Sequence, residues 1–214
     1  MEQKKLIRFV ESFIVLPLVS ITLPLGGVPV TKTALTFGPQ IALFQKTNTE
    51  VSDLLAFNQA TVEDAKIRET RIAAINEYFE KRDMPLAGYG EKFMKASEAN
   101  GLDWRLLPAI SVIETTGGKA LCKRLPPEEK WNPFGWGSCK IGFSSFEEAI
   151  EVVGRNLGGN NPRTARYYKD KTNKEILDAY NPPSIVPDYS QKVLRVMEVI
   201  GPLDLATDIK EKEA

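Results

Sequence analysis

The chain has 214 residues, of which 43% are hydrophobic and 26% are charged, so it is long enough to bury a core in one globular domain with extensions. Lys and Arg together number 28, as do Asp and Glu, and no long basic stripe exists that could follow a phosphate backbone, so we expect no nucleic-acid partner. The absence of histidine excludes Ser-His-Asp and Cys-His nucleophile systems and the usual zinc sites that need imidazole.

Residues 1–30 have the pattern of a targeting segment. Three basic residues within positions 1–8 precede an apolar run over positions 13–25, which has the length of a signal-peptide core. We therefore expect export to the cell envelope or the extracellular space, with residues 1–30 acting as a signal peptide or as a retained membrane anchor. No good cleavage site decides between these two. Glu11 favours a further alternative, a hydrophobic arm packed on the domain.

Residues 31–60 mix polar residues with short apolar patches and are interpreted as a linker. Downstream, apolar residues recur at helical spacing, and capping residues, glycines and prolines bound each stretch. These patterns predict six helices, over approximately residues 61–82, 91–99, 103–114, 145–157, 172–180 and 188–200.

The connections between these helices are predicted to be irregular. Residues 119–143 are dense in proline, glycine and aromatic residues, which indicates a loop with a short hairpin around positions 136–143. Residues 160–171 are expected to form a polar loop, and residues 204–214 a flexible tail. Helices dominate and strands are few, so we predict a compact, mostly α domain over residues 61–203.

Glu114 is an acidic residue whose position on an apolar helix face could serve catalysis or structure. It follows Leu107 by seven residues and Ile110 by four, so it shares their apolar face in the last turn of a predicted helix. Burial and the negative end of the helix dipole both raise the pKa of a carboxyl group in this position. Such a group suits a general acid that protonates a leaving oxygen. The alternative is a structural glutamate that accepts hydrogen bonds from the turn after the helix.

Aromatic and amide side chains are concentrated in segments that follow Glu114 in the chain. Sugars bind by stacking on such rings while amides set their orientation, although aromatic residues at this density also serve as core residues. The residues concerned are Trp131, Asn132, Phe134, Trp136, Phe143, Tyr180 and Tyr189.

Cys122 and Cys139 are the two cysteines of the chain, and they bracket the proline- and glycine-rich segment. Either a disulfide or two free thiols is compatible with this spacing, and the compartment decides between them. If the protein is exported, we expect the cysteines to pair, with a stabilisation of roughly 3 kcal/mol in the chain-entropy description.

Taken in order, a set of motifs over residues 86–200 resembles the glucosaminidase domains of the lysozyme-like superfamily. These are bacterial cell-wall enzymes often labelled mannosyl-glycoprotein endo-β-N-acetylglucosaminidase-like. Each motif is weak alone, whereas the ordered set is fairly specific. The motifs are LAGYG at 86–90, GLDWRLLPAI at 101–110, IETTGG at 113–118, NPFGWG at 132–137, FSSFEEAI at 143–150 and AYNP at 179–182, with Tyr189 after them.

The resemblance implies an α+β lysozyme-like fold with a small β element and a groove for the β-1,4-linked glycan strands of peptidoglycan. It implies that Glu114 is the catalytic acid, and that no metal or cofactor is required. It also implies a set of substrate-binding residues, with the first four forming a groove wall and the last two facing Glu114: Asn132, Phe134, Gly135, Trp136, Tyr180 and Tyr189.

One departure from the family pattern concerns the second carboxylate. Related hydrolases often present one from a hairpin, but residues 138–146 contain no acid, and Glu147 and Glu148 are predicted to begin a helix. Glu128 and Glu129 are the nearest substitutes. A glycoside hydrolase, a lytic transglycosylase and a non-catalytic peptidoglycan-binding module therefore all stay open, as does an envelope scaffold that uses the helix at 61–82 to bind a partner.

Overall fold

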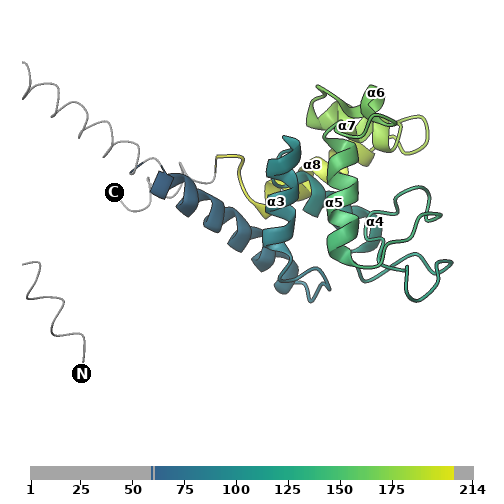
Figure 1. The fold of residues 1–214 in the computed structure, drawn as a ribbon, viewed down its shortest axis with the longest axis horizontal. Coiled ribbons are helices and arrows are strands. Elements are labelled where there is room, and N and C mark those ends of the chain that lie inside the picture. Colours follow the sequence, from purple (N-terminus) through teal and green to yellow (C-terminus); the bar gives the residue numbers. More distant parts are fainter. Residues whose placement is uncertain (1–58, 60, 205–214) are drawn as a thin grey trace, which may run out of the picture. The chain divides into compact units, whose positions relative to one another are not determined.

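The computed structural model describes residues 59 and 61–204, and seven helices are the regular elements of that part of the chain (Figure 1). The fold is therefore mostly α, as the sequence predicts. The predicted targeting segment, most of the linker and the tail lie outside the described residues. One helix covers residues 61–80, and it is followed by α3 (Gly90–Asn100), α4 (Leu106–Thr115), α5 (Phe146–Leu157), α6 (Ala165–Tyr168), α7 (Asn173–Tyr180) and α8 (Tyr189–Ile200).

Several helix ends follow the predicted capping chemistry. Thr172 and Glu175 form a reciprocal capping box at the start of α7, and the hydroxyl of Ser145 accepts a hydrogen bond from the amide of Glu148 at the start of α5. Gly101 ends α3 in the left-handed conformation, with φ of 63°. These interactions are local, which is why the sequence alone indicates them.

Helix α6 lies within residues 160–171, where only a polar loop was predicted. It is a single turn of four residues, too short to show an apolar period. Side chains nearby organise it: Asn156 Oδ1 accepts hydrogen bonds from the hydroxyl of Thr164 at 2.8 Å and from the side-chain amide group of Asn161 at 2.9 Å. The prediction of a plain loop was wrong because these contacts leave no periodic signal.

The predicted hairpin around residues 136–143 is not formed. In the described residues the only strand-like pairing is an isolated bridge between Lys130 and Phe143. Left-handed backbone at Gly137, Ser138 and Cys139, with φ between 56° and 64°, folds this stretch into successive turns. An extended strand cannot pass through such conformations.

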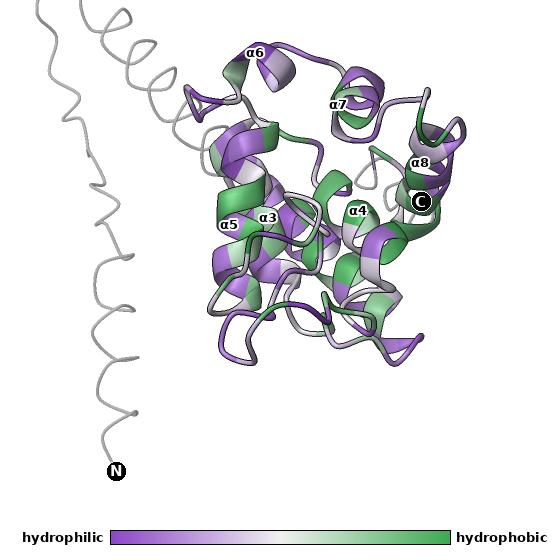
Figure 2. Ribbon diagram, turned by 90° about the vertical axis from the view of Figure 1, so that its right-hand side faces the viewer, coloured by the Kyte–Doolittle hydropathy of each residue, from purple (hydrophilic) through white to green (hydrophobic). Residues whose placement is uncertain are grey.

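The core surrounds α4, which is apolar over most of its length (Figure 2). Helix α4 packs against α8, and α3 lies beside α5 (Figure 1). The helix at residues 61–80 joins the same core through Ile75 and Phe79, which are fully buried, and the ring of Phe79 stacks on that of Phe93 at 5.8 Å. Within the described residues, no helix is both long enough and apolar enough to cross a membrane.

Candidate functional site

The end of α4 places Glu114 at the border between the core and the solvent. The helix stops at Thr115 because Thr116 adopts the left-handed conformation, and the amides of Thr116 and Gly117 then bond back to the carbonyls of Val112 and Ser111. Glu114 is half-buried as a result. Burial raises the pKa of its carboxyl group above the ordinary value, in the direction that the sequence analysis predicts.

Tyr189 is the direct partner of this carboxyl group. It is the first residue of α8, it is buried, and its hydroxyl donates a hydrogen bond of 2.7 Å to Oε1 of Glu114. This bond favours the charged form and partly offsets the effect of burial on the pKa of Glu114. Burial and the negative charge of Glu114 raise the pKa of Tyr189 strongly, so its phenol stays protonated and remains a donor.

Three further rings continue from Tyr189 and form, with it, what we call the aromatic cluster: Trp136, Tyr168, Tyr180 and Tyr189. Tyr180, the last residue of α7, stacks on Tyr189 with ring centroids 5.9 Å apart. Trp136 lies 5.7 Å from Tyr180 and 6.4 Å from Tyr168 by the same measure. Trp136 and Tyr180 are half-buried, whereas Tyr168 and Tyr189 are buried.

Residues 132–136, here called the wall segment, are organised by the side chain of Asn132, which is fully buried. Its carbonyl oxygen accepts hydrogen bonds from the amides of Phe134 and Trp136 at 3.2 and 3.0 Å. Its amide group donates to the carbonyls of Trp136 and Ile141 at 2.9 and 2.8 Å. The structure thus turns the Asn132 side chain toward its own loop rather than toward a ligand.

Phe134 also points inward, since its side chain is fully buried in the core. Its carbonyl group accepts a hydrogen bond from the hydroxyl of Tyr180. Asn132 and Phe134 were predicted to form part of a groove wall, and this stays a prediction. In the structure, the side chain of Asn132 and the carbonyl group of Phe134 fix the course of the wall segment.

Gly135 brings the wall segment against the acid. Its φ is 59°, a left-handed conformation that favours glycine, and a Cβ atom added there would lie 2.9 Å from Oε2 of Glu114. Glycine is therefore needed at this position both for its conformation and for the close approach to the carboxyl group.

The predicted disulfide is present and joins Cys122 to Cys139, with Cα atoms 5.6 Å apart. It closes the stretch of chain that contains the wall segment. Two residues of this region had no predicted role: Tyr168, which lies in the predicted polar loop, and Thr115 of the IETTGG motif, whose hydroxyl donates to the carbonyl of Pro133 at 2.8 Å. Only the position of Thr115 directly after Glu114 could have drawn attention to it.

Two influences act on the pKa of Glu114: burial, which is the larger, and the hydrogen bond from Tyr189. Neither comes from a second acid of the described residues. Glu148 binds the amide and the hydroxyl of Ser144, both at 2.6 Å, in the helix start that the sequence predicts. Glu128 and Glu129 are exposed. Within residues 61–204, no group of Cys, Asp or Glu side chains is arranged as for a metal ion.

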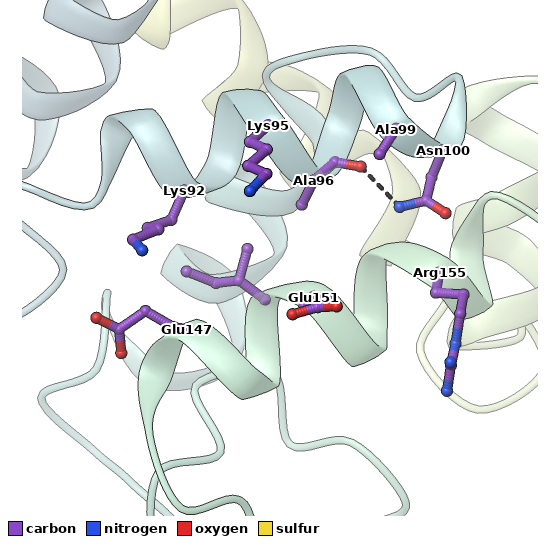
Figure 3. Close-up of a pocket in the computed structure, with 9 residues that line it drawn as sticks. Lys92, Lys95, Ala96, Ala99, Asn100, Glu147, Glu151 and Arg155 are labelled. Carbon is purple, nitrogen blue, oxygen red and sulfur yellow. Dashed lines mark hydrogen bonds between the residues drawn. The ribbon is translucent and has the colours of Figure 1, made fainter.

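A groove of about 310 Å³ lies elsewhere, between α3 and α5 (Figure 3). Small apolar side chains, Ala96 and Ala99, lie on its α3 side, and charged side chains of both signs surround it. None of the predicted site residues lines this groove. A substrate groove beside Glu114 stays a prediction of the family resemblance.

Comparisons with known proteins add no assignment. No protein-family model matches the sequence, and no curated protein matches it. The resemblance to glucosaminidase domains therefore rests on the ordered motifs, and a catalytic role for Glu114 stays a prediction.

Proposed function

We propose that this domain cleaves β-1,4-glycosidic bonds of peptidoglycan and that Glu114 is the general acid that protonates the glycosidic oxygen. The observation that carries the proposal is the half-buried carboxyl group of Glu114, whose pKa is raised by burial, next to the aromatic cluster. A raised pKa keeps a larger fraction of the acid protonated near neutral pH, which general acid catalysis requires.

The two oxygens of Glu114 have different surroundings, and this supports a directed proton transfer. Oε1 accepts the hydrogen bond from Tyr189, which fixes the orientation of the carboxyl group. Oε2 lies against Gly135, so close that a Cβ atom on that residue would come within 2.9 Å of it. In the proposed reaction, Oε2 carries the proton and delivers it to the leaving oxygen of the glycan.

The aromatic cluster supplies ring surface for an amino-sugar chain. Trp136 and Tyr180 are half-buried and tilted by 41° to one another, so they present ring surface in two orientations next to the acid. A ring with an apolar face and a polar edge suits a sugar, which is itself apolar on one face and polar at its rim. The Cys122–Cys139 disulfide is compatible with an exported enzyme, although it supports export only weakly.

Because no second acid of the described residues acts on Glu114, the glycosyl cation that develops needs another partner. In the proposed mechanism the N-acetyl group of the substrate serves as that partner. Water or an internal hydroxyl of the sugar then attacks the anomeric carbon and displaces that group, and the proton of the attacking O–H passes to the Glu114 carboxylate, which regenerates the acid. Attack by water is a hydrolysis, and attack by the internal hydroxyl is a lytic transglycosylation. The masses of the released fragments separate these two routes, because hydrolysis leaves reducing ends and lytic cleavage leaves anhydro ends.

A second candidate function is a peptidoglycan-binding module without turnover. The observation that favours it is that no second acid acts on Glu114 in the described part of the chain. In that case the aromatic cluster binds glycan, and the carboxyl group of Glu114 accepts hydrogen bonds from it.

A zymogram on purified wall material tests the proposal with three proteins: the parent, Glu114→Gln, and Glu80→Gln as a control that removes an exposed carboxylate with no predicted role. We expect clearing by the parent and by Glu80→Gln, and a loss of about 100-fold or more in Glu114→Gln. Binding without clearing by all three proteins would favour the binding module. Equal clearing by parent and Glu114→Gln would refute the catalytic role of Glu114.

A further inference from the structure

Thr115, the residue after Glu114, ends α4 with a buried side chain that is 3% exposed. Its hydroxyl group lies within hydrogen-bond distance of three main-chain groups. It accepts from the amide of Gly118 at 3.0 Å, and it faces the carbonyls of Pro133 at 2.8 Å and Ser111 at 3.1 Å. A hydroxyl group carries one proton, so it donates mainly to the nearer carbonyl, that of Pro133.

The bond to Pro133 joins α4 to the wall segment. Proline has no amide proton, so the carbonyl is its only polar main-chain group, and Thr115 is the one partner of that carbonyl among the described residues. The next carbonyl along the chain, that of Phe134, accepts its hydrogen bond from Tyr180. Two successive carbonyl groups of the wall segment are therefore bound to two different helices, α4 and α7.

Gly135 follows directly and lies against the Glu114 carboxyl group. We infer that Thr115 is a positioning residue: its hydroxyl ties the wall segment to the helix that carries Glu114 and so holds Gly135 against the acid. The catalytic meaning of this inference rests on the proposed function. The geometry itself can be measured without a substrate.

The titratable groups around Glu114 determine how a substitution at Thr115 would change the pKa of Glu114. The titratable groups that act on Glu114 or on its phenol partners are Tyr189 of α8, Tyr180 of α7 and Tyr168 of α6. None of them belongs to the wall segment. If the wall segment loosens, water reaches Glu114 while the hydrogen bond from Tyr189 persists, so the pKa of Glu114 falls toward its ordinary value.

Three substitutions in the full chain test the inference. Thr115→Val keeps the shape of the side chain but removes the hydroxyl, whereas Thr115→Ser keeps the hydroxyl. Ser111→Ala is the matched control, because it removes another buried hydroxyl from α4, one that donates only to the carbonyl of Pro108 at 2.7 Å within the helix. The pKa of Glu114 is measured by carbon-13 NMR of labelled carboxyl groups, with Glu114→Gln identifying the resonance, and kcat is measured on wall material as a function of pH.

We expect Thr115→Val to lower the pKa of Glu114, to move the alkaline limb of the pH–rate profile to lower pH and to reduce kcat by about tenfold or more. Thr115→Ser and Ser111→Ala should keep the parental values. If Thr115→Val does not fold, Thr115→Ala gives the same comparison from a smaller side chain.

An unchanged pKa in the variant that lacks the Thr115 hydroxyl would overturn the inference, and so would an equal shift in Ser111→Ala. The two proposals fail separately. A parent protein that does not cleave wall material would refute the proposed function, while the NMR titration would still decide whether Thr115 positions the wall segment.

Discussion

Tyr189 and Glu114 are 75 residues apart in the chain, and a hydrogen bond of 2.7 Å from the phenol to Oε1 of the carboxyl group joins them where α8 packs on α4. Burial and this bond act on the pKa of Glu114 in opposite directions, and burial is the larger effect. The pair therefore sets the pH range in which the proposed acid is protonated.

Tyr189→Phe should raise the pKa of Glu114 further, because it removes the donor that favours the charged form while the buried ring stays in place. The alkaline limb of the pH–rate profile is then expected to move to higher pH, opposite in direction to the effect of Thr115→Val. Tyr78→Phe is the control, since Tyr78 belongs to the helix at residues 61–80 and its ring packs on Phe79 rather than on the aromatic cluster. A shift to lower pH in Tyr189→Phe would contradict this prediction.

Glu114→Gln should change how stability depends on pH. The folded-state pKa of Glu114 is raised above its ordinary value of 4.5, so its favourable contribution is present below that pH and is lost as the pH rises through the folded-state pKa. The variant lacks this loss, because its neutral side chain stays uncharged. Relative to the parent, its free energy of unfolding in urea should therefore increase as the pH rises above about 4.5. Glu80→Gln, which removes an exposed carboxylate, serves as the surface control, and a parallel pH dependence of parent and Glu114→Gln would count against the prediction.

Gly135→Ala should abolish cleavage, because it adds a Cβ atom next to the carboxyl group of Glu114. Its Cβ would lie 2.9 Å from Oε2 of Glu114, and the left-handed backbone adds about 1–2 kcal/mol of strain for any residue with a side chain. Gly101→Ala is a matched control, because Gly101 has a similar φ of 63° and nothing within 4 Å of the added atom. Both variants should lose stability, and only Gly135→Ala should lose cleavage as well. Loss of cleavage in both would show that backbone strain alone is responsible.

Asn132→Ala should destabilise the protein by about 3 kcal/mol, because it leaves several buried main-chain groups of the loop without partners. Asn160→Ala is the control. Asn160 is exposed and makes a single side-chain bond, to Asn100 at 2.9 Å, so a change within about 0.5 kcal/mol is expected. Urea unfolding measures both. If Asn132 instead acted by binding the glycan, its removal would reduce affinity and leave stability unchanged.

Replacement of both Cys122 and Cys139 by serine should lower the free energy of unfolding by roughly 3 kcal/mol, since the disulfide closes a loop between residues 17 positions apart. The same loss should follow reduction of the parent, and reduction should leave the double variant unaffected. Mass mapping without reductant checks the pairing in protein taken from its native compartment. Free thiols in that sample would count against export as well as against the bond.

The helices of this protein could be predicted from its sequence because their signals are local. The Thr172–Glu175 capping box and the glycine at position 101 act on residues within one turn, and the helical period placed Glu114 on the apolar face of α4. The single turn of α6 escaped prediction because one turn is too short to show a period.

The candidate site could be predicted only in part. The sequence indicated Glu114 and the rings of Trp136, Tyr180 and Tyr189, but it assigned the Asn132 side chain to a ligand, whereas the structure uses it to fold its own loop. Periodicity determines which way a side chain points in a helix. In a loop that direction depends on which main-chain groups need partners, and this is decided by tertiary contacts.

The sequence by itself therefore determined a mostly α domain with one acid on an apolar helix face, because both follow from interactions between near neighbours in the chain. Only the tertiary structure decided which groups contact that acid. The packing of α8 on α4 places the Tyr189 hydroxyl on Glu114. The hydrogen bond from the Thr115 hydroxyl to the Pro133 carbonyl holds the segment in which Gly135 contacts the same carboxyl group. Those contacts join distant parts of the chain, so they form only when the whole core is assembled.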